Sequence, residues 1–177
     1  CLTSAVHLPP LDATIAETGP RTDALLYLLK TLSPQFDQTV VLGDNYFIKN
    51  SLEEGLEQGI KYSHLEIHLI LGGVGLPEKL RTHLIALLNR NQPARSFPLI
   101  LSSMGISEFG VNLFFESAET IRLRQLVKAT PALREKLLGI EENPDNTPMF
   151  FNYFPQSFYV EDVEGELIVT NLDLRAP

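Results

Sequence analysis

The sequence has little cysteine, no long apolar run and no cluster of basic residues, and each absence excludes a class of protein. Its only cysteine is Cys1, so an intrachain disulfide, a zinc ribbon and a CxxC redox pair are impossible. No apolar run approaches the roughly 20 residues that a membrane-spanning helix needs. A signal segment, in which basic residues precede an apolar stretch, is also absent. We therefore expect a protein without a membrane span, in a reducing compartment such as the cytoplasm.

The charge balance argues against nucleic acid as a partner. The chain carries 22 acidic and 14 basic residues, a net charge of −8. Proteins that bind nucleic acid usually display a basic stripe. The densest basic stretch, Arg122, Arg124 and Lys128, falls at helical spacing with acids nearby. We interpret it as a solvated helix face, and we expect neither nucleic acid nor an anionic membrane as a partner.

Length and hydrophobicity indicate one folded domain. Hydrophobic residues make up 44% of the 177-residue chain and charged residues 20%, which is typical of a globular protein. We expect an N-terminal arm over 1–21, a core over 22–105 and a second half over 106–177. Because the chain begins with Cys1 rather than Met, we favour a trimmed terminus. A lipidated cysteine and the nucleophile of an N-terminal hydrolase are the alternatives.

Three short apolar runs predict parallel strands that are covered on both faces. They span 39–42, 65–71 and 99–101, and small or polar residues follow each of them. Runs of this kind are typical of strands buried on both faces. Between them we expect one helix from a capping box at 51–54 and another from Pro77. Strand, helix, strand, helix, strand is the βαβαβ pattern, whose crossovers are almost always right-handed.

The second half has a different pattern. A strand is predicted over 110–116 and a helix over 117–128, and Pro131 restarts a short helix because it would break a continuous one. Residues 149–172 are predicted to form strands with a hairpin turn at Glu164 and Gly165. The fold class is therefore predicted as α/β. It would hold a mixed sheet with a parallel βαβαβ core flanked by helices, and an antiparallel C-terminal extension.

Small and polar residues at the ends of three predicted strands form the first candidate site. The carboxyl ends of parallel strands meet at one edge of a sheet, where ligands bind in open α/β folds. Glycines there let backbone N–H groups approach an anionic group, which the following helix also favours. Pro77 removes one donor, so a tight structural turn is the favoured alternative. The candidate ligand-binding residues are Asp44, Asn45, Gly72, Gly73, Gly75, Ser102 and Ser103.

Two family resemblances involve the first of these strand ends. Residues 40–45, which read VVLGDN, resemble an internal strand end of the sugar-nucleotide pyrophosphorylases. The same residues are similar to the Gly-Asp-Asn step of the metallophosphatases. The glycine-rich nucleotide loop of the first family and the downstream histidine motifs of the second are missing from the chain. Neither resemblance therefore assigns a family.

A second candidate site consists of His64, Glu66 and His68, which are residue types that bind metals. On a strand these alternate side chains would share one face. The two histidines would then lie about 13 Å apart at roughly 3.3 Å per residue, too far to bind one ion easily. We favour a polar strand face and predict no metal site. No motif names a cofactor, and whether the protein is an enzyme stays open.

Two glycines in the second predicted helix, Gly55 and Gly59, indicate a close contact. Each costs about 1 kcal/mol of helix stability relative to alanine. We expect the bare backbone to lie against the sheet or a neighbouring helix. A helix of a partner protein is the alternative.

The aromatic residues concentrate near the C-terminus. Six of the fifteen (ten Phe and five Tyr in all) fall within 150–159. Because strand alternation assigns only half of them to one face, some are exposed unless another layer or subunit covers them. They predict either a filled core or a surface for a partner. The candidate partner-binding residues are Phe151, Tyr153, Phe158 and Tyr159.

Two hypotheses for the function follow. The first is a non-catalytic module for protein interaction or self-assembly within a larger complex, because a catalytic motif is missing and the aromatic stretch is present. It implies a protein partner or a homo-oligomer. The alternative is a small-molecule-binding protein, or a hydrolase or transferase, that holds an anionic ligand at the carboxyl ends of the parallel strands.

Overall fold

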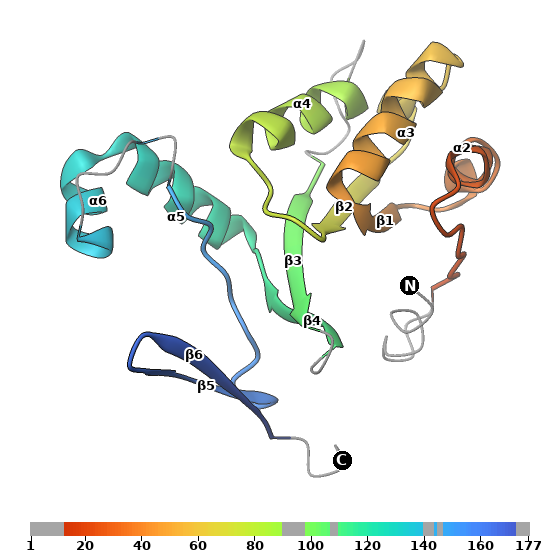
Figure 1. Cartoon of the computed structure of the whole chain (residues 1–177). Helices are drawn as coiled ribbons and strands as arrows, with labels where there is room; N and C mark the ends of the chain where they lie inside the picture. The colour runs from red at the N-terminus through yellow and green to blue at the C-terminus, as the bar shows by residue number, and fades with distance from the viewer. Residues whose placement is uncertain (1–12, 90–97, 107–109, 140–143, 145–146, 173–177) are drawn as a thin grey trace. The chain divides into compact units, whose positions relative to one another are not determined.

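The computed structural model describes residues 13–89, 98–106, 110–139, 144 and 147–172 (Figure 1). Cys1 and the rest of 1–12 in the predicted arm lie outside these residues. The chain divides into two units, the first ending at Ser102 and the second beginning at Ser103. The fold is α/β, as predicted: one sheet has the strand order β1-β2-β3-β4, and a separate hairpin joins β5 to β6. The strands are β1 (Thr39–Asp44), β2 (Ile67–Gly72), β3 (Ile100–Ile106), β4 (Gly110–Phe115), β5 (Phe158–Val163) and β6 (Glu166–Asn171).

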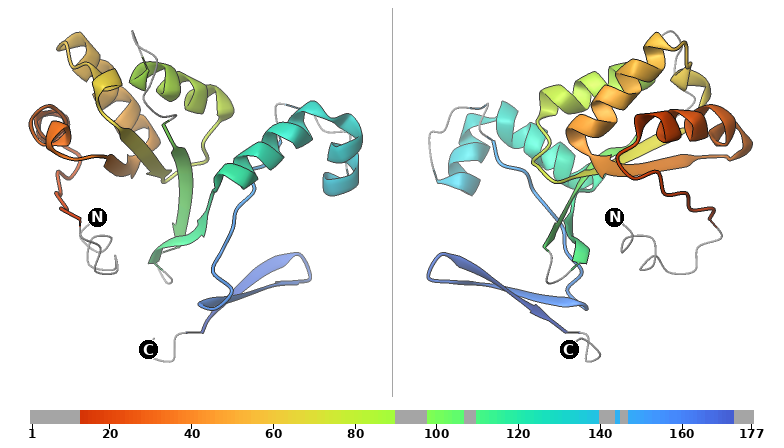
Figure 2. Two further views of the ribbon diagram at one scale, coloured as in Figure 1. Left: turned by 180° about the vertical axis from the view of Figure 1, so that it is seen from behind. Right: turned by 45° about the vertical axis from the view of Figure 1, so that its right-hand side comes forward.

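The first unit contains the predicted βαβαβ arrangement. Strand β1 runs parallel to β2, and β2 runs parallel to the first half of β3. Helix α3 (Asn45–Glu57) connects β1 to β2, and helix α4 (Glu78–Leu88) connects β2 to β3. Both crossover helices lie on the same side of the sheet (Figure 2). This is what right-handed crossovers dictate when each new strand is added on the same side of the last one.

The face of the sheet beneath these helices forms the core. In β2, the alternating residues Ile67, Leu69 and Leu71 are at most 3% exposed. The buried residues of the two helices above this face include Ile48, Leu52, Leu84 and Leu87. Because burying one such side chain stabilises the fold by about 1.5–3 kcal/mol, this layer holds the first unit together.

The opposite face of the sheet carries exposed side chains, although we predicted strands that are covered on both faces. Val40 and Leu42 of β1 are 45% and 55% exposed, and Leu99, just before β3, is 47% exposed. Among the described residues, that prediction is therefore wrong. The strands read as apolar throughout, but the topology places both crossover helices on one face only.

The starts of both helices also differ from the prediction. Helix α3 begins at Asn45 rather than at Ser51, because the Asp44 carboxylate accepts the N–H groups of Tyr46 and Phe47 at 2.9 and 3.0 Å. Ser51 lies inside the helix, and its hydroxyl is 3.0 Å from that of Thr22 in helix α2 (Thr22–Thr31). Pro77 is the N-cap of α4 and not its first residue.

Gly55 lies where α3 meets two neighbours. A Cβ atom at this position would stand 1.9 Å from Tyr62 Oη and 2.8 Å from Leu26 Cδ2 of α2. Tyr62 lies in the short 3₁₀ helix η2 (Tyr62–His64), and its hydroxyl donates to Leu52 O at 3.0 Å. The predicted close contact is confirmed for Gly55. Gly59 instead lies just after the end of α3 and has φ +81°. Glycine is favoured at this position because it adopts a left-handed backbone conformation without strain.

The second unit begins in the second half of β3, which pairs antiparallel with β4. Ser117 and Thr120 form a capping box at helix α5 (Ala118–Ala129), and Pro131 starts helix α6 (Pro131–Leu138) as predicted. Its buried residues include Leu113 of β4 and Val127 of α5. Residues 149–157 were predicted as strand and are not. One isolated bridge, from Asn152 to Phe115, pairs them with the sheet. Pro155, which has no N–H to donate to a ladder, interrupts the stretch soon afterwards.

Candidate functional sites

The predicted strand-end edge does bring several of its candidate residues together. Asp44 pairs with Gly72 across β1 and β2. Asn45 is the first residue of α3. Its side-chain amide donates through Nδ2 to Val74 O at 3.1 Å and to Gly75 O at 3.2 Å. A side chain on Gly73 would place its Cβ 3.2 Å from Asp44 Oδ2. The glycine loop after β2 is therefore hydrogen-bonded to the start of α3 and packed against it.

Asn45 is the buried centre of this edge, with 0% exposure. Its Nδ2 holds the loop, whereas Oδ1 is buried with no hydrogen-bond donor among the described residues. A buried polar atom that loses its partner costs about 1–3 kcal/mol. The orientation of the amide is fixed by the two carbonyls of the loop, since both of them need a donor.

The contacts of this edge give the glycine loop a structural role. At two positions the loop turns carbonyl oxygens, not N–H groups, towards Asn45. The N-terminal N–H groups of α3 are already capped by the Asp44 carboxylate, which would repel an incoming anion. Gly73 has φ +90°, so the turn itself requires a glycine there. An anionic ligand at this edge stays a prediction.

Ser102 and Ser103 lie inside β3, not after it. The prediction ended this strand at 101, but β3 continues to Ile106 because its second half gains β4 as a partner. Ser102 pairs with Leu71 and is 3% exposed. Ser103 pairs with Phe115 in the antiparallel ladder of the second unit. Neither serine is at a strand end, which corrects that part of the candidate site.

The second candidate site also has a different geometry from the one predicted. Strand β2 begins at Ile67, so of the three residues only His68 lies in a strand. His64 belongs to η2, and Glu66 lies between η2 and β2. The Nδ1 atom of His68 accepts the N–H of Leu99 at 3.1 Å, and its Nε2 atom is 3.8 Å from Glu66 Oε1. Among the described ranges, no three His, Cys, Asp or Glu side chains are grouped to hold a metal ion.

A cavity of about 280 Å³ opens at the amino ends of the strands, opposite the predicted edge. Sequence reasoning did not foresee it. Its lining includes Asp37, His64 and Glu66, together with Asn89 at the end of α4. The sequence signal for this cavity is a polar residue shortly before each of two neighbouring strands, Asp37 before β1 and Glu66 before β2.

The β5–β6 hairpin exposes several large apolar side chains. None of its twelve strand residues is buried. Tyr159, Leu167 and Ile168 are 55%, 59% and 41% exposed. The strands join through a two-residue turn in which both Glu164 and Gly165 have positive φ, as predicted for a tight hairpin.

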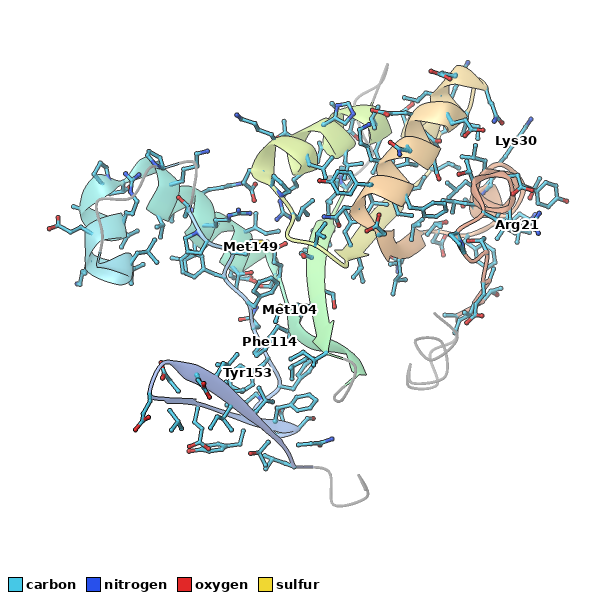
Figure 3. The ribbon with its side chains drawn as sticks, viewed as in Figure 1. Arg21, Lys30, Met104, Phe114, Met149 and Tyr153 are labelled. Atoms are coloured by element: carbon cyan, nitrogen blue, oxygen red, sulfur yellow. The ribbon has the colours of Figure 1, made fainter. Side chains whose placement is uncertain are left out.

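The predicted partner-binding residues divide into two groups. Tyr153 and Tyr159 are exposed, at 37% and 55%, whereas Phe151 and Phe158 are half-buried. Tyr153 packs edge-on against Phe114 with ring centroids 6.3 Å apart (Figure 3). The prediction missed the aliphatic contribution of the hairpin, from residues such as Leu167, because an alternating strand pattern does not reveal that a strand lacks neighbours.

The two faces of the hairpin differ in chemistry. Cross-strand pairing places alternate residues on one face, here called the acidic face: Tyr159, Glu161, Val163, Glu166, Ile168 and Thr170. The other face, called the apolar face, consists of Phe158, Val160, Asp162, Leu167, Val169 and Asn171. Residues 158–172 contain four acids and no Lys or Arg. The Asp162 carboxylate is engaged in the turn, where it accepts the N–H of Gly165 at 2.8 Å.

The hydrogen-bond pattern shows which backbone groups of β5 and β6 point away from the hairpin. The N–H of Leu172 donates to Ser157 O at 2.8 Å. Because hydrogen-bonded and non-bonded pairs alternate in an antiparallel ladder, Val160 and Val169 form a non-bonded pair. Their N–H and C=O groups therefore point away from the hairpin, Val160 along the β5 edge and Val169 along the β6 edge.

No protein-family model matches the chain, and no curated protein matches it in sequence. Within the described ranges, no helix combines the length and the hydrophobicity that crossing a bilayer requires.

Proposed function

We propose that the protein is a non-catalytic interaction module that binds a strand of another protein along the β5 edge. The observation that carries the proposal is the β5–β6 hairpin, which has two chemically distinct faces and no buried strand residue. A two-stranded hairpin is at best marginally stable alone in water. A third strand would pair with the N–H and C=O groups that Val160 points outwards, and it would cover part of the exposed side chains of the hairpin.

The two faces specify the chemistry of the partner strand. A strand added beside β5 alternates its side chains between the acidic and the apolar face. On the acidic face its side chains would lie near Glu161, so basic residues are favoured there. On the other face they would lie near Phe158 and Val160, so aliphatic residues are favoured. The expected partner is thus an extended segment in which lysine or arginine alternates with valine, isoleucine or leucine.

Charge also separates this partner from a second copy of the chain. Two hairpins edge to edge would bring two sets of four acids together, which is unfavourable. The basic helices α5 and α6 of another copy offer one route to self-association, since 118–138 holds five basic and two acidic residues. Self-association by that route would be seen as an oligomer that dissociates in salt.

Three peptides test the proposal with the 177-residue chain. One alternates lysine with valine over about eight residues, a typical strand length. The second replaces lysine by glutamate, and the third replaces valine by serine. We expect the lysine–valine peptide to bind with an affinity that falls as salt is added, and the other two to bind at least about tenfold more weakly, a difference of about 1.4 kcal/mol.

Two proline variants make the test specific to the β5 edge. Val160→Pro removes an N–H that points outwards from β5 and should abolish binding. Val169→Pro removes the equivalent group from β6 and should leave binding intact. Equal loss in both variants, or binding of all three peptides alike, would contradict strand addition at β5. Oligomerisation of the free chain that Glu161→Lys abolishes would replace the separate partner by a second copy.

A second function, binding of an anionic small molecule at the strand ends, has one observation in its favour. The buried Oδ1 atom of Asn45 has no donor among the described residues, and a ligand hydroxyl or amide would supply one. Thermal-shift measurements with nucleotides and sugar phosphates test this alternative. Stabilisation that Asn45→Leu removes from a folded protein would support it.

A further inference from the structure

The cavity at the amino ends of the strands has a lining that favours positive charge. Its volume is about 280 Å³, and its described lining residues all belong to the first unit. Two of them are acids, Asp37 just before β1 and Glu66 just before β2. None of the described lining residues is Lys or Arg. The lining therefore offers carboxylates without a resident lysine or arginine to neutralise them.

Ser33 adds a hydroxyl to this lining. It is the first residue of the short 3₁₀ helix η1 (Ser33–Gln35), and only 6% of it is exposed. Its main-chain oxygen accepts the N–H of Phe36 at 3.2 Å. The hydroxyl itself has no hydrogen-bond partner among the described residues. Because the large majority of buried hydroxyls have a partner, a molecule inside the cavity is the natural partner for this one.

The end of α4 and the two carboxylates add negative potential. Helix α4 ends at Leu88, which lines the cavity together with the C-cap Asn89. The last turn of α4 contains no basic residue, so the negative end of its dipole is not offset within the helix. Asp37 is exposed and forms no ion pair with another described residue. Glu66 contributes a second carboxylate, with Oε1 3.8 Å from His68 Nε2.

An organic cation fits these acceptors better than a metal ion does. Within the described ranges, no three His, Cys, Asp or Glu side chains are grouped to hold a metal. An amine or a guanidinium needs no such group, because each of its N–H bonds can donate separately to a carboxylate, a hydroxyl or a backbone carbonyl. The acceptors of this cavity come from separate segments of the chain, which suits a ligand with several donors.

The volume limits the size of the ligand. About 280 Å³ corresponds to about nine water molecules at roughly 30 Å³ each, and so to a ligand of about nine non-hydrogen atoms. We propose that the cavity binds a small organic cation of this size, with its amine or guanidinium group held by Asp37, Glu66 and Ser33. This site is independent of the strand-binding edge of β5, which belongs to the second unit.

Agmatine is a suitable probe, because it has a guanidinium at one end, an amine at the other and about the required size. When it is titrated into the isotope-labelled 177-residue chain, we expect saturable amide shift changes at Ser33, Asp37, Glu66 and Asn89. Pentanediol, which has a similar length and no charge, and sodium chloride at the same ionic strength should not cause them. Changes that do not saturate, that spread over the acidic surface or that pentanediol reproduces would overturn the proposal.

A blocked tripeptide with a central arginine distinguishes two sources of the cation. Binding of agmatine but not of the tripeptide supports a free small molecule. Equal binding of both supports an arginine side chain of another protein, and binding of neither contradicts the proposal.

Charge-matched variants make the test specific to the cavity. Asp37→Asn should weaken agmatine binding at least about tenfold, because it removes a charged acceptor. Glu57→Gln removes the same charge from the end of α3, outside the described lining, and should leave binding unchanged. Ser33→Ala should also weaken binding in a protein whose thermal unfolding shows that it is folded. Equal effects of Asp37→Asn and Glu57→Gln would contradict the proposal.

The same variants separate this proposal from strand binding at β5. Asp37→Asn should leave binding of the lysine–valine peptide intact, and Val160→Pro should leave binding of agmatine intact. Loss of agmatine binding in Val160→Pro would place the cation on the hairpin and overturn the proposal.

Discussion

The contact between Gly55 and Tyr62 permits a quantitative prediction about the packing of α3. Gly55→Ala places a Cβ atom 1.9 Å from Tyr62 Oη, which forces the ring or the helix to shift. Overpacking costs about 1–3 kcal/mol, and so short a contact belongs in the upper part of that range, at about 2–3 kcal/mol. Alanine in a helix returns about 1 kcal/mol relative to glycine. The expected net loss in the free energy of unfolding is about 1–2 kcal/mol. Equilibrium unfolding in urea measures it.

Removing the hydroxyl reveals the cause of this loss. Tyr62→Phe alone forfeits the bond to Leu52 O and should cost about 0.5–1.5 kcal/mol. In that background the nearest atom to the new Cβ becomes Leu26 Cδ2 at 2.8 Å, the end of a flexible side chain. Gly55→Ala should then be close to neutral, so the two substitutions together should cost about 1–2 kcal/mol less than their sum.

The matched control is Gly59→Ala. Nothing lies within 4 Å of a Cβ at this position, and the cost arises from φ +81° alone. It should destabilise the protein by about 1–2 kcal/mol with either Tyr or Phe at position 62. Additivity of Gly55→Ala and Tyr62→Phe within about 0.5 kcal/mol would refute the steric explanation.

Three further predictions concern titration, a turn and a cap. Burial raises the pKa of the Tyr62 phenol, so the folded state keeps a proton that the unfolded state loses above about pH 10. The free energy of unfolding should therefore fall by up to about 1.4 kcal/mol per pH unit above that point, and urea titrations of Tyr62→Phe should lack this component. Glu164 has φ +56° in the hairpin turn, and Glu164→Asn should stabilise the hairpin by about 0.5–1 kcal/mol, seen as slower amide exchange in β5 and β6. Ser117→Ala removes the hydroxyl that caps α5 and should cost about 0.5–2 kcal/mol of stability, whereas Ser117→Asp should restore it; failure of that rescue would contradict the capping assignment.

Hydrophobic pattern predicted the βαβαβ order but not which faces are covered. Val40 and Leu42 look like core residues in the sequence because they belong to a continuous apolar run. Their exposure follows from topology, since successive right-handed crossovers put α3 and α4 on the same side. The start of α3 was missed for a local reason. Asp44 and Asn45 have the residue types of a turn after a strand. Ser51 and Glu54 have the spacing of a capping box, although both lie inside the helix.

The strand-end site shows a similar division. Topology was sufficient to predict that Asp44 and the glycine loop lie together, because strand ends meet at one edge. It could not predict that Asn45 binds two carbonyl groups of that loop, since this depends on which way the peptide units turn. The extension of β3 past Ser102 was also beyond the sequence pattern, because pairing with β4 and not local propensity maintains the strand.

The most direct measurement of the proposed function is an amide chemical-shift map of the labelled chain titrated with the lysine–valine peptide. The proposal predicts that the largest changes fall in β5, at Val160 and its neighbours, with smaller changes across β6. Strand β1 is an internal comparison, because it is also a sheet edge with exposed aliphatic residues but holds only one acid, Asp44. Changes centred on β1, or spread evenly over both edges, would contradict recognition by the acidic hairpin.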